Sequence, residues 1–149
     1  MEIKKFSIAI IGCGSRGAEA YGRIMADQKD RFEIAALCDV NEAKLKKYGG
    51  IFGVKADALF SREEEFFAAK RADALVIATM DNDHVRQCEK ALQLGYDVLL
   101  EKPVTGSEAE CARLLAAHEK YGGKVVVCHV LRYAPAYVKL KQILAGQSC

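Results

Sequence analysis

The sequence predicts an α/β protein with a doubly wound, mainly parallel sheet and helices on both of its faces. Apolar runs of strand length alternate with segments of helical periodicity, as in repeated βαβ units. Residues 8–11, 75–77 and 125–127 are apolar at consecutive positions, which is typical of strands buried on both faces of a parallel sheet. A glycine-rich loop follows the first run, at the kind of strand end where such folds bind ligands.

The first half of the chain is expected to contain a strand, a helix, a strand, two short helices and a strand. In that order they are expected at residues 6–11, 15–28, 32–38, 41–48, from residue 61 onward, and 73–78. Asn41 is a suitable N-cap for the first short helix, which is expected to end near Tyr48. Ser61 and Glu64 have capping-box spacing and predict the start of the second.

The second half is expected to contain three helices and two strands. The helices are expected at residues 82–94, 107–122 and 136–144, and the strands at 96–100 and 124–130. Gly95 and Gly122 follow the first two of these helices, where glycine readily adopts the left-handed conformation of a helix end. Ser107 and Glu110 form a second capping box, and Gly146 closes the last helix.

The loop after the first strand has the pattern Gly-x-Gly-x-x-Gly and consists of Gly12, Cys13, Gly14, Ser15, Arg16 and Gly17. Because it joins a buried strand to a helix, it matches the dinucleotide-binding fingerprint of a Rossmann-type fold. Gly12 permits the tight turn, Gly14 lets the backbone approach a pyrophosphate, and Gly17 lets the helix pack closely on the strand. The helix start offers N–H groups and its positive dipole end to the phosphates.

Asp39 ends the second strand, 22 residues after Gly17, where the fingerprint places an acidic residue. Its carboxylate can accept hydrogen bonds from both hydroxyls of an adenosine ribose, and it would repel a 2′-phosphate. The sequence therefore predicts NAD as the cofactor in preference to NADP. Two interpretations of Arg16 stay open, because it could lie over the pyrophosphate or adenine or be solvated like most arginines.

The composition is that of a soluble globular protein, with 51% hydrophobic residues, 28% charged residues and a net charge of +2. This balance gives no reason to expect nucleic acid or a membrane as a partner. No apolar run approaches the roughly 20 residues that span a bilayer, and the first residues lack the features of a signal peptide. The six cysteines lack zinc-binding spacing, Cys38 and Cys128 are expected in the core, and a cytoplasmic location is expected.

Four features together resemble the Gfo/Idh/MocA oxidoreductase family, which includes inositol dehydrogenase and glucose–fructose oxidoreductase. They are the glycine loop, Ala78-Thr79 followed by His84, Glu101-Lys102-Pro103, and Arg132-Tyr133-x-Pro135. The resemblance covers essentially the whole chain, with the features in the family's order. It implies a dehydrogenase that transfers hydride between NAD and a sugar, inositol or related polyol.

The resemblance implies that Lys102 faces the nicotinamide and the substrate. A lysine there can stabilise charge that develops on the reacting oxygen and can join a proton relay. Glu101 would contact the nicotinamide ribose or orient Lys102, and Pro103 would fix the turn, often with a cis peptide bond in this family. Taken alone, a lysine at a strand end is more often simply solvated.

The resemblance extends to the cofactor and substrate contacts on either side. Thr79 is expected to contact the dinucleotide, mostly through its backbone. His84 has two open interpretations, a contact with the cofactor or a capping and packing role. Met80 stands where the family usually has proline, so a somewhat looser loop is expected. Arg132 and Tyr133 would border the substrate pocket.

The resemblance also divides the chain into a dinucleotide-binding domain, residues 1–131, and a crossover helix with the start of a second domain, residues 132–149. In the family the second domain supplies most of the sugar-binding surface and the oligomer interface. The full-length protein is therefore expected to be a homo-oligomer. This chain alone is expected to bind the cofactor without turnover, and exposed apolar surface could make it dimerise.

Two other functions stay open at this point. Some relatives are NAD-dependent glycosidases, in which the cofactor oxidises and then re-reduces the same sugar. An arginine like Arg16 also occurs in their glycine loop. Other relatives keep the fold as non-catalytic NAD-sensing regulators, although a pure sensor has no need for Lys102.

Overall fold

The structure is a computed structural model that describes residues 5–146, and it contains one six-stranded sheet with the order β3-β2-β1-β4-β5-β6. The strands are β1 (Phe6–Ile11), β2 (Phe32–Cys38), β3 (Leu59–Phe60), β4 (Ala74–Ile77), β5 (Asp97–Leu100) and β6 (Val125–Val127). Every pair of neighbouring strands is parallel. The predicted α/β class is confirmed, and the strand order is that of a Rossmann-type doubly wound fold.

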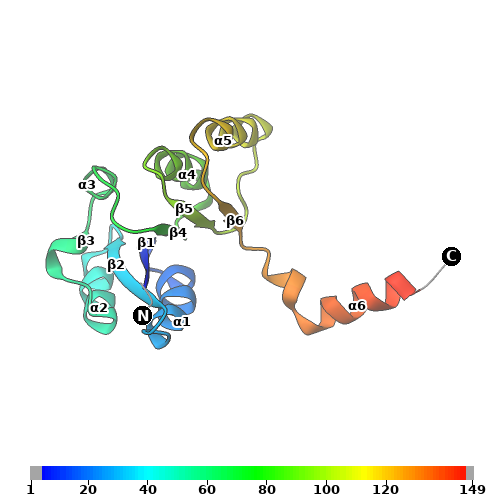
Figure 1. Ribbon diagram of the computed structural model, residues 1–149, viewed down its shortest axis with the longest axis horizontal. Helices are drawn as coiled ribbons and strands as arrows, with labels where there is room; N and C mark the ends of the chain where they lie inside the picture. Colours follow the sequence, from blue (N-terminus) through cyan, green and yellow to red (C-terminus); the bar gives the residue numbers. More distant parts are fainter. Residues whose placement is uncertain (1–4, 147–149) are drawn as a thin grey trace.

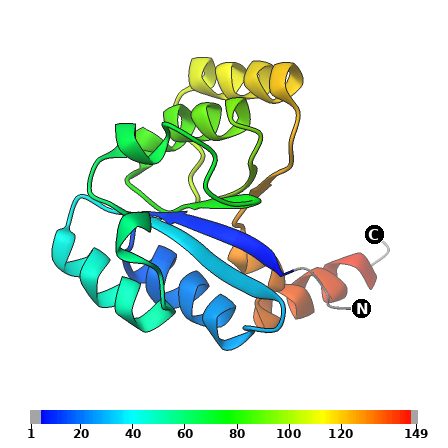
Figure 2. The same cartoon turned by 60° about the vertical axis from the view of Figure 1, so that its left-hand side comes forward.

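Helices cover both faces of the sheet (Figures 1 and 2). One face carries η1 (Ser15–Gly22), α1 (Arg23–Asp27) and α2 (Glu42–Phe52). The other face carries α3 (Glu63–Phe66), α4 (His84–Gln93) and α5 (Glu108–Tyr121). Each face has its own apolar core, with Leu37 and Tyr48 buried on the first and Phe66 and Tyr96 on the second. Two layers of helices thus bury both sides of the central strands, as parallel sheets require.

Two predicted helices differ in detail from the structure. The helix expected at 15–28 begins as a π-helix, η1, and continues as α1. The next helix, α2, runs to Phe52 instead of ending near Tyr48. Gly49 and Gly50 lie inside the helix, and Gly49 packs closely on β3, where a Cβ would come within 2.8 Å of Leu59. Gly53, with φ of 71°, ends the helix instead.

The two predicted capping boxes have different outcomes. The box at Ser61 is wrong, because α3 begins after Arg62 and has no side-chain cap. Ser61 directly follows β3, a two-residue strand that the sequence did not predict. At α5, the Ser107 hydroxyl accepts a hydrogen bond from the Glu110 N–H, as predicted, but the Glu110 carboxylate bonds to the Thr105 hydroxyl instead of reaching back to Ser107.

Residues 125–127 were expected to be buried on both faces, and this is wrong. They form β6, which is an edge strand paired only with β5, and Val126 is 58% exposed. The apolar run predicts burial without identifying what provides it, and within residues 5–146 nothing covers Val126 fully. Beyond β6, the short helix η4 (Val130–Tyr133) leads into α6 (Pro135–Gly146), which extends away from the sheet (Figure 1) and has no buried residue.

Candidate functional site

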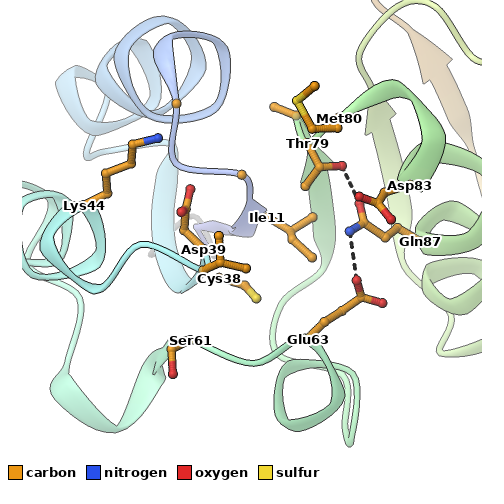
Figure 3. A pocket seen from close by; sticks show the side chains of 14 residues that line it. Ile11, Cys38, Asp39, Lys44, Ser61, Glu63, Thr79, Met80, Asp83 and Gln87 are labelled. Atoms are coloured by element: carbon orange, nitrogen blue, oxygen red, sulfur yellow. Dashed lines mark hydrogen bonds between the residues drawn. The ribbon is translucent and has the colours of Figure 1, made fainter.

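A cavity of about 420 Å³ lies at the carboxyl edge of the sheet, between the ends of β2 and β4 (Figure 3). Its walls come from the glycine loop, the segment after β2, the start of α3 and the start of α4. The lining residues are Ile11, Gly12, Gly14, Cys38, Asp39, Val40, Lys44, Ser61, Glu63, Ala78, Thr79, Met80, Asp83 and Gln87. The cavity lies where the strand order reverses, and open α/β sheets bind ligands at that point.

The three glycines of the loop have different physical roles. Gly12 has φ of 90°, and a Cβ there would lie 2.4 Å from the Ala78 carbonyl oxygen. A Cβ at Gly17 would lie 1.9 Å from the carbonyl oxygen of Gly12, so these two positions require glycine for the fold itself. Gly14 has an extended backbone, and a Cβ there would meet no protein atom within 4 Å. The fold does not require glycine at position 14, which faces the cavity.

The Asp39 carboxylate is held in place by the backbone on both sides. Its Oδ2 accepts a hydrogen bond from the Cys13 N–H at 2.7 Å, and its Oδ1 accepts one from the Asn41 N–H at 2.8 Å. Each oxygen keeps lone-pair capacity toward the cavity. The Cys13 thiol beneath is fully buried, and burial, helped by the Asp39 charge, raises its pKa to about 12. Cys13 is therefore a neutral packing residue near pH 7.

Lys44 is a lining residue that the sequence analysis missed. It lies in the first turn of α2, where its backbone N–H donates to the Asn41 side chain at 3.1 Å, and Asn41 is the N-cap as predicted. Figure 3 shows Lys44 and Asp39 on the same side of the cavity, across from Thr79 and Gln87. The spacing of Lys44 from Asp39, in the first helical turn after the strand-ending acid, could have identified it.

The opposite wall contains a chain of hydrogen bonds. The Thr79 hydroxyl donates to Gln87 Oε1 at 2.6 Å, and Gln87 Nε2 donates to Glu63 Oε2 at 3.0 Å (Figure 3). Glu63 also accepts from Arg86 and from Lys90. Burial would raise the pKa of Glu63, but the hydrogen bonds from Arg86, Gln87 and Lys90 outweigh it and lower the pKa to about 2. Glu63 is therefore ionised at neutral pH.

Several of these residues carry only a weak sequence signal. Glu63 belongs to an acidic run that is typical of a solvated helix start. Gln87 lies one helical turn after His84, so helical periodicity places it on the buried face of α4, where it is 3% exposed. Val40 and Met80 are 92% and 76% exposed although both are apolar, and both line the cavity. An apolar residue two or three positions after a strand end, beyond the apolar run itself, was a usable signal.

The Glu101-Lys102-Pro103 segment follows β5 and does not line this cavity. Glu101 is buried, and its carboxylate accepts hydrogen bonds from the Tyr21 hydroxyl at 2.6 Å and from the Lys102 backbone N–H at 3.1 Å. Tyr21 also contacts Cys128, which is half-buried rather than in the core. Burial and these hydrogen bonds raise the pKa of Tyr21. The Lys102–Pro103 peptide bond is cis, and the Lys102 side chain is exposed.

His84 is 1% exposed and lies at the start of α4. Its Nδ1 is 2.7 Å from the carbonyl oxygen of Pro103, and its Nε2 has no hydrogen-bond partner within residues 5–146. Because the carbonyl can only accept, Nδ1 carries the proton in this contact. The geometry thus favours the packing interpretation, in which His84 joins the helix to the turn after Lys102.

The other candidates lie on the surface. Ser15 and Arg16 are exposed at the start of η1, next to Gly14. Arg132 and Tyr133 are exposed in η4, away from the residues that line the cavity. In the described part of the chain, no cluster of histidine, cysteine and acidic residues is arranged to hold a metal ion. None of the helices in residues 5–146 has the length and apolarity needed to cross a membrane.

Comparison with known proteins places this geometry in context. A family profile described as "Oxidoreductase family, NAD-binding Rossmann fold" (GFO_IDH_MocA) matches residues 6–129. The chain is 27% identical over 138 residues to an inositol 2-dehydrogenase/D-chiro-inositol 3-dehydrogenase of Shouchella clausii, covering 92% of this chain and 39% of that protein. It is 32% identical over 136 residues to a D-apiose dehydrogenase of Paraburkholderia graminis, covering 90% and 35%.

Solved structures give the same result for the fold. The scyllo-inositol dehydrogenase of Lactobacillus casei, solved with NAD(H) and scyllo-inositol, superposes with a TM-score of 0.84 at 22% identity, covering 95% of this chain and 41% of that one. The WlbA dehydrogenase of Bordetella pertussis, solved with NADH and UDP-GlcNAcA, gives a TM-score of 0.84 at 27% identity, covering 95% and 42%. The chain thus spans about 40% of the length of these proteins.

Proposed function

Because the chain belongs to the Gfo/Idh/MocA oxidoreductase family and contains its NAD-binding Rossmann fold, we propose that it holds NAD(H) along the carboxyl edge of its sheet. The observation that carries the proposal is the combination of Gly14 and Asp39. A glycine that the fold does not require and a carboxylate fixed by two N–H groups face one cavity. A pyrophosphate followed by a ribose needs these two features side by side.

The proposed binding mode follows the cavity from the loop outward. The pyrophosphate lies on the backbone of Gly14 and the first N–H groups of η1, beside Ser15 and Arg16. The ribose hydroxyls donate to Asp39, and the base lies beyond the ribose, between Val40 and Met80. The two exposed apolar side chains then gain a partner to pack against.

For the whole protein, we propose hydride exchange between the nicotinamide and a sugar, inositol or related polyol. Lys102 would donate a hydrogen bond to the reacting oxygen and stabilise its developing negative charge. Glu101, fixed by Tyr21, would orient Lys102 through its backbone N–H. Arg132 and Tyr133 would border the substrate, and the division at residue 131 and a homo-oligomeric state remain predictions.

The oxidoreductase is preferred here to the glycosidase and the sensor. The relatives compared above are named dehydrogenases, and both solved structures are dehydrogenases. The chain also retains Lys102 in the Glu-Lys-Pro segment, and a pure sensor has no need for this lysine.

Calorimetric titration of this chain with NAD⁺ and NADP⁺ tests the proposal. NAD⁺ should bind and NADP⁺ should bind more weakly, because Asp39 repels a 2′-phosphate. Asp39→Ala should lower the affinity for NAD⁺ by roughly 10- to 100-fold, which corresponds to one or two hydrogen bonds to a charged group. It should also bring the affinities for NAD⁺ and NADP⁺ closer together. Asp30→Ala, in an exposed turn outside the cavity, is the matched control. A folded chain that binds neither dinucleotide would refute the proposal.

A further inference from the structure

Glu63, in the wall opposite Asp39, has all of its hydrogen-bonding capacity in use. An ionised carboxylate can only accept hydrogen bonds. The Glu63 oxygens receive bonds from both terminal nitrogens of Arg86, from Lys90 and from Gln87. The carboxylate is thus saturated by four donors from α4, and it is held ionised by them. Its oxygens have no hydrogen-bonding capacity left for a ligand, so Glu63 affects the cavity only by orienting Gln87.

The saturated carboxylate fixes the orientation of Gln87. The amide NH₂ of Gln87 must face Glu63, because the opposite orientation would place its carbonyl oxygen against a carboxylate. The carbonyl oxygen therefore faces Thr79, 2.6 Å from the hydroxyl oxygen. Gln87 is 3% exposed, so solvent cannot satisfy the reversed orientation.

The orientation of Gln87 in turn fixes the role of Thr79. A threonine hydroxyl has one proton, and here it is donated to Gln87. Toward the cavity, Thr79 Oγ1 therefore offers only lone pairs, and it can accept a hydrogen bond but cannot donate one. The wall is selective for a ligand group that carries a proton.

The position of Thr79 indicates which ligand group that is. Thr79 and Gln87 lie across the cavity from Asp39, and Glu63 and Ser61 lie at the end away from Lys44 (Figure 3). With the ribose at Asp39 and the base between Val40 and Met80, one edge of the base lies against Thr79, which directly precedes Met80 in the same wall. We propose that Thr79 Oγ1 accepts a hydrogen bond from the amino group of adenine, and that Gln87 and Glu63 are positioning residues that make the site select adenine over hypoxanthine. This inference rests on the proposed binding of NAD(H).

The test compares NAD⁺ with nicotinamide hypoxanthine dinucleotide, which carries a carbonyl oxygen in place of the amino group, by calorimetry on this chain. The unmodified chain should bind NAD⁺ at least about tenfold more tightly than the analogue. In the analogue the hypoxanthine carbonyl oxygen would face Thr79 Oγ1, and both atoms can only accept a hydrogen bond there. Thr79→Val should reduce the ratio of the two affinities to within about twofold, and Thr79→Ser should restore it.

A second variant tests the positioning role. Gln87→Met frees the Thr79 proton, so the hydroxyl can rotate and donate to the hypoxanthine carbonyl, and the ratio should fall by about the same factor as in Thr79→Val. Gln93→Met, on the exposed end of α4, is the matched control and should keep the ratio. Circular dichroism checks that each variant is folded.

The outcomes separate the two proposals. Equal affinity of the unmodified chain for both dinucleotides, or a ratio that persists in Thr79→Val, overturns the inference while leaving NAD⁺ binding intact. An equal loss of affinity for both dinucleotides in Thr79→Val would also overturn the inference, because Thr79 would then contact a ribose hydroxyl and not the base. If neither dinucleotide binds to the folded chain, the proposed function itself fails.

Discussion

The carboxyl edge of the sheet has two halves that the chain prepares differently. Around β1, β2 and β4, two polar side chains that face the cavity are themselves fixed, Asp39 by two backbone N–H groups and Thr79 by Gln87. At the end of β5, the backbone is fixed through Glu101, but the side chain of Lys102 is exposed. The comparison indicates that residues 5–146 preorganise recognition of a dinucleotide and leave the group proposed for chemistry unconstrained.

The largest effect is expected at Gly17, which belongs to the first half. Alanine there would place Cβ 1.9 Å from the Gly12 carbonyl oxygen, which is backbone and cannot move away cheaply. We expect Gly17→Ala to lower the free energy of unfolding by about 3 kcal/mol or more. Urea denaturation followed by circular dichroism measures this change. An unchanged midpoint would show that the loop is less tightly packed than described.

The next largest effect is expected at Gly14, where fold and binding separate. Gly14→Ala should leave the free energy of unfolding within about 0.5 kcal/mol, because the added Cβ meets no protein atom. It should lower the affinity for NAD⁺ about 30-fold, because the methyl group blocks the approach of the pyrophosphate to the backbone. Thermal unfolding and calorimetry on the same sample give both values. A variant that loses stability but keeps its affinity would reverse this assignment.

A smaller effect is expected from Glu63 and depends on pH. Its pKa of about 2 in the folded chain lies below the ordinary value of 4.5, so its contribution to stability is fully present above about pH 5. That contribution is lost as the pH falls from about 4.5 toward 2, and we expect it to amount to about 1–2 kcal/mol after allowance for solvent. Glu63→Gln should flatten the stability profile in this pH range, as measured by urea denaturation. A steeper profile in the variant would contradict the assignment.

The smallest effect is expected at Lys102, in the second half. Lys102→Met should change the free energy of unfolding by less than about 0.5 kcal/mol, because the side chain is exposed. NAD⁺ affinity should stay within about threefold, which is near 0.6 kcal/mol. Calorimetry is again the measurement. A loss of tenfold or more would remove the distinction between the two halves, because Lys102 would then belong to the binding machinery of this chain.

The sequence was sufficient where the signal is local. The second strand was predicted with its observed bounds, Phe32–Cys38, because an apolar run ends at a polar residue. The loop glycines were predicted because their Gly-x-Gly-x-x-Gly pattern is local, although the contact that excludes a Cβ at Gly12 is with the distant Ala78. The cis peptide bond before Pro103 followed from the family resemblance, since nothing in the local sequence requires it.

The sequence was insufficient where the signal is distributed. β3 has only two residues, too few to show periodicity, and its omission led to the wrong cap at Ser61. The bond between Glu63 and Gln87 joins residues 24 positions apart, and a glutamine on a helix gives no sign of its partner. β6 carries the apolar run of a central strand, yet it lies at the edge of the sheet with Val126 58% exposed, because an apolar run alone does not give the position of a strand in the sheet.

The bond from the Cys13 N–H to Asp39 couples two subsites that are usually treated as independent. A substitution at position 39 to a residue without a side-chain oxygen, made to accommodate a 2′-phosphate, also removes the acceptor that anchors the phosphate loop. Redesign of the cofactor preference would therefore have to supply the Cys13 amide with a new acceptor. Asparagine retains one such oxygen without the charge, so Asp39→Asn is a more conservative first substitution than Asp39→Ala.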